Sequence, residues 1–341
     1  MLQKLFICLA FATAISAAGN GCTLGKSVNK PVIDGTPVYW PAAWNETQPA
    51  PQLDNGQSCS WIVTVPRGYY AKLIISGKTT DKDSRFQTVD AAGNLIRTTQ
   101  ENMEPYYFAA PKFTLTVANE GSATFAFKVV WWPLPTVDFE YSTGPTGWII
   151  NATNAVYAHE YSEGGGITLM VFPENETSYS SLRSALVYEG RSLSSANYVS
   201  NLNLLCQTKK QWASTQNAIF VVNLEASLSK DILLVQANRY LTGIDEMVEL
   251  RPQLNSIYNG TVHGGTQMSS LVSVANINMQ MIDAQMINES NLTVYRGSPA
   301  AYTFKQNYTG AQLKSALPLS FSGTFVQFVV SSGQAVFTFK S

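Results

Sequence analysis

Two histidines, His159 and His263, are the side chains of this chain best suited to proton transfer near neutral pH. A serine hydrolase would need one of them beside an activated serine, yet the sequence has no Gly-x-Ser-x-Gly motif or similar nucleophile turn. Two histidines without a cysteine–histidine cluster also do not make a zinc ligand set. We therefore interpret both as surface or loop histidines and predict no catalytic residue, no metal and no cofactor.

Two groups of acidic residues have spacings that suggest a site. Asp81, Asp83 and Asp90 come nearest to a calcium cluster, but calcium takes about six to eight oxygen ligands and Lys82 interrupts the group. Four glutamates flank a triple glycine, and two of them facing each other would suggest a glycosidase: Glu160, Glu163, Glu174 and Glu176. Nothing in the sequence fixes their separation, so we interpret both groups as solvated loop charges.

Aromatic residues are dense in the first 135 positions and would suit stacking on sugar rings. They are Trp40, Trp44, Trp61, Tyr69, Tyr70, Tyr106, Tyr107, Trp131 and Trp132. Adjacent pairs such as Tyr69-Tyr70 and Trp131-Trp132 place one member on each face of a strand. Half of the group is therefore expected in a core, and the other half is a candidate glycan-binding face. Core packing alone is the favoured interpretation.

The elements that position these residues are predicted to be strands. In residues 113–128, Phe113, Leu115 and Val117 alternate with threonines, a turn follows, and the alternation resumes, which predicts an antiparallel hairpin. Similar segments recur about every 8–12 residues with turn signals between them, the pattern of an antiparallel sandwich. Residues 19–58 are rich in proline and predict an extended arm with one short edge strand near 37–40. Residues 277–286 are ambiguous and would suit a helix by composition.

Spaced similarities predict internal repeats. The pattern Gly-x-Ala-x-Phe-x-Phe-Lys occurs at 121–128 and again at 333–340, which is 212 positions later. Val-Tyr-x-Gly begins at Val187 and at Val294, 107 positions apart. A period near 107 fits three sandwiches in series, with a degenerate middle copy. We predict a signal peptide (1–18), a first sandwich (19–135) and two further sandwiches (136–240 and 241–341); two domains remain the alternative.

Composition and the N-terminus indicate a secreted protein. Lys4 precedes an apolar run, Leu5–Ile15, and Ser16-Ala17-Ala18 offers small residues for cleavage, as in a signal peptide. No later segment has 18 consecutive apolar residues, so no transmembrane span is predicted. Charged residues make up only 13% of the chain and the net charge is −1, which excludes an electrostatic nucleic-acid surface.

The cysteines fit an oxidising compartment. Once Cys8 leaves with the signal peptide, Cys22, Cys59 and Cys206 remain. Two of the three should pair, and we favour Cys22–Cys59 because these two are close in sequence. Cys206 is interpreted as a buried thiol, with an intermolecular disulfide as the alternative.

Seven Asn-x-Ser/Thr sequons are present, and we expect most of them on surface loops, some carrying glycan. The predicted acceptors are Asn45, Asn151, Asn175, Asn259, Asn291 and Asn307. The seventh, Asn288, is too close to Asn291 for both to be occupied.

Several spaced blocks resemble the nematode CUB-like domain family. They are Cys59–Leu73 (CSWIVTVPRGYYAKL), Val89–Ile96, Pro105–Phe108, Pro111–Leu115 and Phe125–Pro135. The similarity covers about residues 20–135 and implies a jelly-roll-like β-sandwich, secretion, a link to gut defence and innate immunity, and no enzymatic activity. Many CUB domains bind calcium through a tyrosine, a glutamate and two aspartates, but no acidic set here maps onto that pattern.

The sequence features and the resemblance lead to three candidate functions. The first is an extracellular binding protein of innate defence that recognises microbial or host glycoconjugates or extracellular proteins. The second is a structural or mucus-layer component held by weak multivalent contacts. The third, a glycan-active hydrolase, needs two carboxylates across a cleft, for which the sequence gives no sign. We favour the first.

Overall fold

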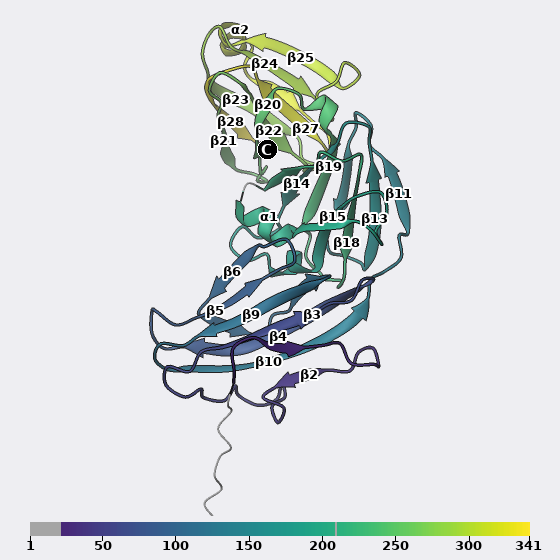
Figure 1. The fold of residues 1–341 in the computed structure, drawn as a ribbon. Coiled ribbons are helices and arrows are strands. Elements are labelled where there is room, and N and C mark those ends of the chain that lie inside the picture. The colour runs from purple at the N-terminus through teal and green to yellow at the C-terminus, as the bar shows by residue number, and fades with distance from the viewer. Residues whose placement is uncertain (1–21, 209) are drawn as a thin grey trace, which may run out of the picture.

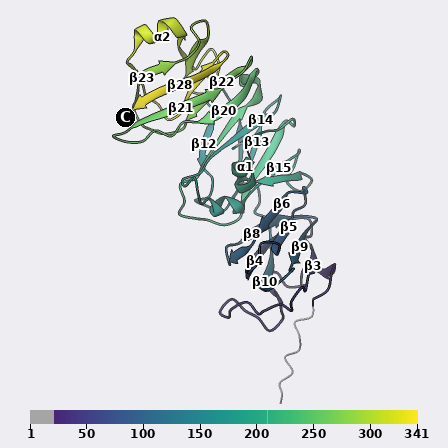
Figure 2. The ribbon, with the colours of Figure 1, turned by 90° about the vertical axis from the view of Figure 1, so that its left-hand side faces the viewer.

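The computed structural model describes residues 22–208 and 210–341. These residues form six β-sheets that pack in pairs as three sandwiches, stacked one after another along the chain (Figure 1). The same order is seen in the view turned by 90° (Figure 2). The prediction of an all-β protein of tandem sandwiches is confirmed. The predicted signal peptide, residues 1–18, lies outside the described residues. No helix in the described part of the chain has the length and apolarity needed to cross a membrane.

The first sandwich has two sheets. In spatial order, one consists of β1 (Lys26–Val28), β3 (Cys59–Thr64), β9 (Lys112–Ala118), β5 (Arg85–Val89) and β6 (Leu95–Thr98). The other consists of β2 (Val38–Trp40), β10 (Ala123–Pro133), β4 (Tyr69–Thr79) and β7 (Gln100–Asn102), and β8 (Tyr106–Ala109) also pairs with β4. The strand expected near 37–40 is therefore β2, and β1 is an additional strand of the N-terminal arm.

The second sandwich repeats this arrangement. One sheet is β11 (Phe139–Ser142), β13 (Tyr157–Ser162), β18 (Ala218–Asn223), β15 (Ala185–Glu189) and β16 (Asn197–Asn201). The other is β12 (Trp148–Asn151), β19 (Ile232–Ala237), β14 (Ile167–Phe172) and β17 (Gln211–Ala213). Its helical segments are α1 (Leu202–Thr208) and two 3-10 turns, Ser180–Ser184 and Asn238–Tyr240.

The third sandwich has the same two-sheet plan. One sheet is β20 (Ile244–Glu249), β22 (Met268–Ser273), β27 (Val326–Val330), β24 (Asn291–Tyr295) and β25 (Phe304–Thr309). The other is β21 (Ile257–His263), β28 (Gln334–Lys340), β23 (Met279–Gln285) and β26 (Leu319–Phe321), and α2 (Gly310–Ala316) follows β25. The ambiguous segment 277–286 is thus a strand, and Met279, Met281 and Ala284 turn into its core.

The similarities seen in the sequence fall at equivalent places in these sheets. The two Gly-x-Ala-x-Phe-x-Phe-Lys segments form β10 and β28, which occupy the same position in the strand order of their sheets. Val187 and Val294 likewise lie in β15 and β24, the fourth strands of the corresponding sheets. In each sandwich the first strand pairs in parallel with the third, as β1 does with β3. The domain boundaries themselves stay a prediction.

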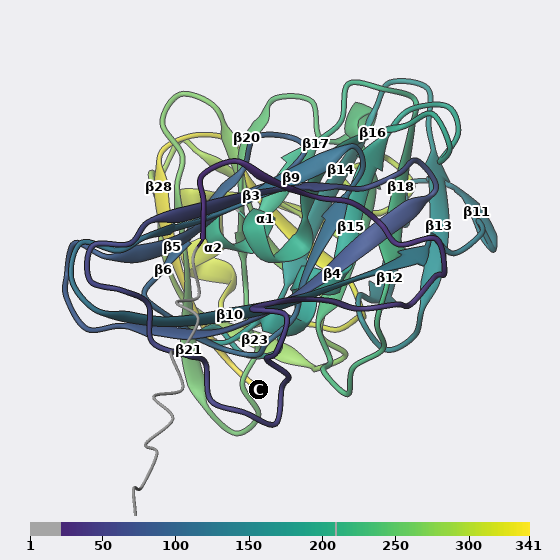
Figure 3. The same cartoon turned by 60° about the horizontal axis from the view of Figure 1, so that its bottom comes forward.

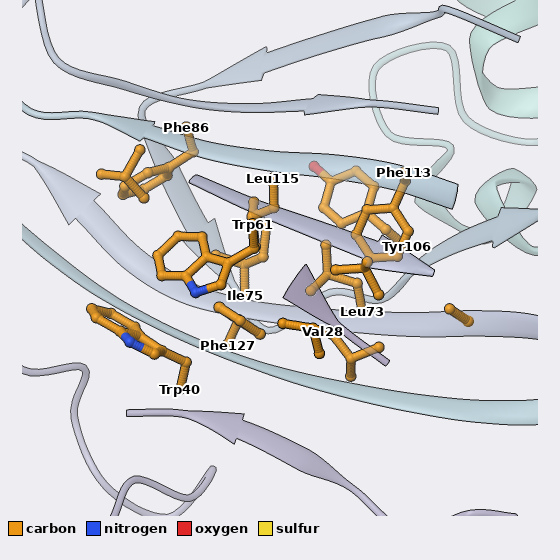
Figure 4. Packing of buried hydrophobic residues seen from close by; sticks show 14 of the residues in the cluster. Val28, Trp40, Trp61, Leu73, Ile75, Phe86, Tyr106, Phe113, Leu115 and Phe127 are labelled. Carbon is orange, nitrogen blue, oxygen red and sulfur yellow. The ribbon is translucent and has the colours of Figure 1, made fainter. Parts of the chain in front are cut away.

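In the first sandwich, every second residue of a strand points inward, and these residues fill the core. In β3, Cys59, Trp61 and Val63 are buried, and the residues between them are half-buried. Trp61 lies at the centre of an aromatic group, with its ring centroid 4.9 Å from those of Trp40 and Phe127 (Figure 4). Such edge-to-face contacts add to the gain from burying the rings.

The three sandwiches are joined by two apolar interfaces. Between the first and second lie residues from both sandwiches, including Tyr107, Ala109, Ala158, Leu186, Tyr188, Phe220, Val222 and Leu224. Between the second and third lie Met170, Phe172, Leu234, Leu241, Met247, Val272 and Phe325. In both cases the second sheet of one sandwich faces the first sheet of the next. Figure 3 shows the stack obliquely from the end of the first sandwich.

Candidate functional site

The two histidines lie in different sandwiches. His159 is in β13, where its ring stacks on Tyr157 with 4.1 Å between centroids, whereas His263 ends β21 and is exposed. The Nε2 of His159 lies 3.6 Å from Oδ1 of Asp138. Burial lowers the pKa of His159, and the nearby Asp138 carboxylate opposes this only in part. His159 is therefore neutral at neutral pH and serves as an aromatic and hydrogen-bonding surface.

The aspartates of the first sandwich shape turns. The Asp81 carboxylate accepts hydrogen bonds from the backbone N–H of Ser84 at 2.7 Å and from its hydroxyl at 2.6 Å, and these bonds lower the pKa of Asp81. Asp90 accepts from the backbone N–H of Asn94 at 2.8 Å and from the Tyr198 hydroxyl at 2.9 Å. Within residues 22–208 and 210–341, no three His, Cys, Asp or Glu side chains are grouped so as to hold a metal ion.

The four glutamates near the triple glycine have separate partners. Glu163 pairs with Arg239, Glu174 accepts from the backbone N–H of Lys230, and Glu176 lies 3.1 Å from Arg251. Glu160 sits beside Glu140 in the pairing of β13 with β11, and burial together with that charge raises the pKa of Glu160. Glu163, Glu174 and Glu176 thus each make a local contact of their own, whereas Glu160 lies beside a like charge.

Most of these aromatic residues of the first sandwich are buried rather than on a binding face. The rings of Trp40, Trp44, Trp61, Tyr106, Tyr107 and Trp131 are all buried, at 7% exposure or less. Tyr69 and Tyr70 are half-buried, and Trp132 is 44% exposed. Trp132 covers Gly35, where an added Cβ would lie 2.5 Å from the indole ring. The candidate aromatic face in this sandwich is therefore reduced to one tryptophan.

A different group of aromatic residues lies at the open edge of the middle sandwich. Phe139 and Tyr141 alternate along β11, an edge strand of one sheet, and Trp148 begins β12, an edge strand of the other. His159 is the partner of Phe139 in the parallel pairing of β11 with β13. We call Phe139, Tyr141, Trp148 and His159 the aromatic edge.

Tyr141 is the centre of the aromatic edge. Its ring centroid is 4.7 Å from that of Trp148, 6.0 Å from Phe139 and 5.2 Å from His159. On its inner side, Tyr141 stacks at 5.1 Å on the buried Tyr161. These contacts anchor the exposed rings to the core and reduce the entropy lost on binding a ligand.

The outer rings of the aromatic edge are available to a ligand. Phe139 is 58% exposed and Trp148 39% exposed. The Trp148 indole N–H donates to the carbonyl of Ser142 at 3.0 Å, which fixes the orientation of the ring. Beside His159, the side chain of Asp138 is 41% exposed and presents carboxylate oxygens as acceptors. Flat apolar rings next to a carboxylate match a pyranose, which has apolar C–H faces and hydroxyl donors at its rim.

A cleft of about 890 Å³ lies between the second and third sandwiches. In its lining, Glu249 is nearly buried and lies 2.9 Å from Lys210 and 2.6 Å from Arg251, whereas Asp245 and Glu246 have no ion-pair partner among the described residues. Across the cleft, the backbone N–H of Met247 donates to the side-chain oxygen of Gln211 at 3.2 Å. This contact and the Lys210–Glu249 pair link the two sandwiches.

Two of the three cysteines form a disulfide and the third is a buried free thiol, the arrangement favoured from the sequence. A disulfide joins Cys22 to Cys59, with the Cα atoms 5.5 Å apart, and ties the N-terminal arm to β3. Cys206 is a free thiol on α1 with 6% exposure. Burial raises the pKa of Cys206 to about 12.

The sequons occupy several kinds of surface. Asn175, Asn259, Asn288 and Asn307 are exposed, and Asn45, Asn151 and Asn291 are half-buried. In Asn45 and Asn175 the side-chain oxygen accepts from the backbone N–H of the sequon threonine, at 3.0 and 2.9 Å. The Asn151 side-chain oxygen likewise accepts from the backbone N–H of Thr153 at 2.9 Å, and its amide nitrogen also donates to the carbonyl of Ser229 at 3.1 Å. Glycan occupancy stays a prediction.

The sequence carried a signal for the aromatic edge. Tyr157, His159 and Tyr161 alternate along one strand and Phe139 and Tyr141 along another, so each set lies on one face. The sequence did not show that these two strands pair in parallel. That pairing brings the two sets of aromatic residues together.

Comparison with known proteins identifies the first sandwich. Residues 17–135 match the CUB-like domain family, so this part of the chain is a CUB-like domain and the resemblance seen in the sequence is confirmed. No curated protein matches the chain. Among solved structures, the CUB1-EGF-CUB2 domains of rat MASP-1 are similar at 8% identity, covering 62% of this chain and 99% of that one, with a TM-score of 0.25. The full extracellular region of zebrafish Gpr126/Adgrg6 is similar at 8% identity, covering 93% of this chain and 52% of that one, also with a TM-score of 0.25.

Proposed function

We propose that this protein is a secreted, non-enzymatic binding protein of innate defence that recognises microbial or host glycoconjugates through the aromatic edge. The observation that carries the proposal is the group of rings around Tyr141, in which Phe139 and Trp148 are exposed and the Asp138 carboxylate lies beside His159. A CUB-like domain with a disulfide between Cys22 and Cys59 is in keeping with an extracellular protein.

The defence role comes from the resemblance to the nematode CUB-like family and is part of the proposal. So is the division of the chain at 135/136 and 240/241 into three domains. The lack of a catalytic role is supported by the placement of the two histidines in different sandwiches and by the separate partners of Glu163, Glu174 and Glu176.

The alternative is a structural or mucus-layer component. An intermolecular disulfide through Cys206 would favour that role, but the thiol is buried against the core of the second sandwich. The binding role is therefore preferred.

The test is binding of the mature protein to a panel of bacterial and host glycans, with calcium and with chelator, for the wild type and for Trp148→Ala. We expect chelator-insensitive binding that the substitution weakens. Chelator-sensitive binding would contradict the aromatic edge as the site and would point to a metal. No binding to any glycan of the panel would overturn the glycan proposal and would favour a protein partner or a structural role.

A further inference from the structure

A pocket of about 180 Å³ lies at the open edge of the third sandwich, between β25 of one sheet and β26 of the other. Its polar lining consists of Arg296, Lys305, Gln306, Ser320 and Ser322, and all of these residues are exposed or half-buried. The volume corresponds to roughly six water molecules and is smaller than the ~300 Å³ at which sites for drug-sized ligands begin. The pocket therefore suits one small polar group of a ligand.

The guanidinium of Arg296 lies at this pocket. Arg296 follows the last residue of β24, and its Nη2 donates to the hydroxyl oxygen of Ser322 at 3.1 Å. Its aliphatic stem passes Gly323, where an added Cβ would lie 3.9 Å from Cγ and Cδ of Arg296. In the described part of the chain, Arg296 is not among the arginines that form ion pairs. Its other N–H groups therefore remain available to a ligand, and so does the hydroxyl hydrogen of Ser322.

A β-bulge brings a second cation to the same pocket. The register of β24 against β25 shifts between Val294 and Tyr295, and Lys305 is the extra residue. Neighbouring residues of a regular strand point to opposite faces, but a bulge changes the local direction of the side chains. Lys305 and its neighbour Gln306 consequently both line the pocket. Among the described residues, Lys305 is not one of the lysines that form ion pairs.

Gln306 adds a neutral donor. The Tyr308 hydroxyl donates to Oε1 of Gln306 at 3.0 Å, so the acceptor of this amide is in use and its NH₂ group remains for a ligand. Among the described residues, the lining includes no Asp or Glu. The pocket thus presents two cations, an amide donor and serine hydroxyls without an internal anion to bind them.

The first sandwich has its own anion at the equivalent place. There β6 and β7 occupy the positions that β25 and β26 have in the third sandwich. The Glu101 carboxylate of β7 accepts from the hydroxyls of Thr98 and Tyr106, both at 2.7 Å, and the space left beside them is only about 10 Å³. The third sandwich keeps donors at this place but supplies no carboxylate, so an anion from outside fits there.

We propose that this pocket binds a tetrahedral oxyanion, a sulfate or phosphate group. Its oxygens accept from the guanidinium of Arg296, the ammonium of Lys305 and the amide of Gln306. A guanidinium and an ammonium both bind such groups. The donors come from the end of β24, from β25 and from the segment around β26, and the oxygens of a tetrahedral group can accept from several sides. A planar carboxylate has both oxygens in one plane. The proposal does not rest on the aromatic edge, which lies in the second sandwich.

The experiment uses five small anions as probes: methyl sulfate, methyl phosphate, inorganic sulfate, inorganic phosphate and acetate. Methyl sulfate and acetate carry the same single charge, so that their comparison isolates the tetrahedral geometry. Binding to the mature full chain is measured by titration calorimetry for the wild type, Arg296→Gln and Lys305→Gln. The control is Lys112→Gln, which removes an exposed cation from β9 of the first sandwich. Circular dichroism confirms that each variant folds.

The wild type is expected to bind methyl sulfate about fivefold more tightly than acetate, the worth of one further hydrogen bond. Arg296→Gln and Lys305→Gln should each weaken methyl sulfate and methyl phosphate about tenfold, because each removes a charged hydrogen bond. Lys112→Gln should change neither affinity. Tighter binding of the methyl esters than of the inorganic ions would assign the site to an oxyanion carried by a larger molecule, and the reverse order would assign it to the free ion.

Three results would overturn the proposal. The first is no saturable binding of either methyl ester by the wild type, which would mean that the pocket holds water only. The second is an acetate affinity equal to that of methyl sulfate, which would contradict a tetrahedral site. The third is an equal weakening by Lys112→Gln and the two pocket variants, which would show that the anions respond to the overall charge of the protein.

Discussion

The rings of Tyr106 and Tyr107 are neighbours in β8 but lie in two different apolar clusters. Tyr106 is in the core of the first sandwich, and Tyr107 is in the interface with the second. Across this interface, Lys72 lies 2.6 Å from Glu225 of the second sandwich and 5.7 Å from the Tyr107 ring. The first two sandwiches are thus held together by an apolar contact whose rim carries an ion pair.

Replacing Tyr107 by alanine should loosen this interface. Tyr107 is 4% exposed, and truncating a buried aromatic side chain costs roughly 3 kcal/mol of unfolding free energy. Differential scanning calorimetry should show the first sandwich melting at a lower temperature and apart from the rest. Trp132→Ala is the control, because that ring is 44% exposed and its loss should cost about 1 kcal/mol or less. Equal losses from both variants would show that Tyr107 has no special place in the interface.

The strand pattern could be predicted from the sequence because it depends on neighbouring residues. The repeats could be predicted because similar short segments recur along the chain. Phe113, Leu115 and Val117 alternate in the sequence and are buried alternately in β9. Which strands meet across the stack could not be predicted in this way. In β14 every residue is buried, since Leu169 points into its own sandwich and Met170 into the next. The continuous apolar run of this strand was the available sign of burial on both faces.

The sites depend on contacts distant in the sequence. The aromatic edge needs Phe139 and His159 to be partners in a parallel pair. A pocket between the first two sandwiches is lined by Arg67 of the first and Tyr188 of the second. Local residue patterns carry no information on such long-range contacts, so the sequence suggested an aromatic face in the first sandwich, where most of these rings are buried, and not the aromatic edge of the second.

Substitutions in the aromatic edge should weaken glycan binding without unfolding the protein. Phe139→Ser and Trp148→Ala each remove an exposed ring, and we expect affinity to fall about tenfold for each. The unfolding free energy should change by roughly 1 kcal/mol for Phe139→Ser, whose residue is 58% exposed, and by more for Trp148→Ala, because Trp148 is only 39% exposed. Phe304→Ser is a matched control in the third sandwich, where that ring is 46% exposed. Glycan-array binding reduced equally by all three variants would argue against a specific site.

His159 should make stability fall on mild acidification. The unfolded imidazole has a pKa of about 6.5, and burial lowers that value in the folded protein. The unfolded state therefore binds the proton more tightly, so the contribution of neutral His159 is complete above pH of about 6.5 and is lost as the pH falls toward the lowered pKa. Urea unfolding at pH of about 7.5 and 5.5 should show a smaller loss for His159→Gln than for the wild type. His263→Gln, at an exposed position, should follow the wild type.

Cys206 should resist thiol reagents in the folded protein. Burial raises its pKa to about 12, so the reactive thiolate is scarce at neutral pH. A cysteine placed at exposed Thr266, which lines the same cleft as Cys206, is the control. We expect Cys206 to react roughly two orders of magnitude more slowly than Thr266→Cys with dithionitrobenzoate, and at a similar rate once denatured. Fast reaction of native Cys206 would restore the intermolecular disulfide, and with it the structural role, as a serious alternative.

Asn151 and Asn175 should differ in glycan occupancy and in their effect on stability. The Asn151 side chain donates to Ser229 and accepts from the backbone N–H groups of Thr153 and Asn154, both at 2.9 Å. A glycan on Asn151 would have to grow from the same nitrogen that makes the Ser229 bond, whereas Asn175 is exposed.

Mass spectrometry of the secreted protein should therefore find Asn175 glycosylated and Asn151 largely free. In material treated to remove glycans, Asn151→Gln should lower the unfolding free energy by roughly 1–2 kcal/mol, because buried hydrogen bonds are lost, and Asn175→Gln should leave it nearly unchanged. Full occupancy of Asn151 in a stable protein would mean that its hydrogen bonds contribute little to the fold.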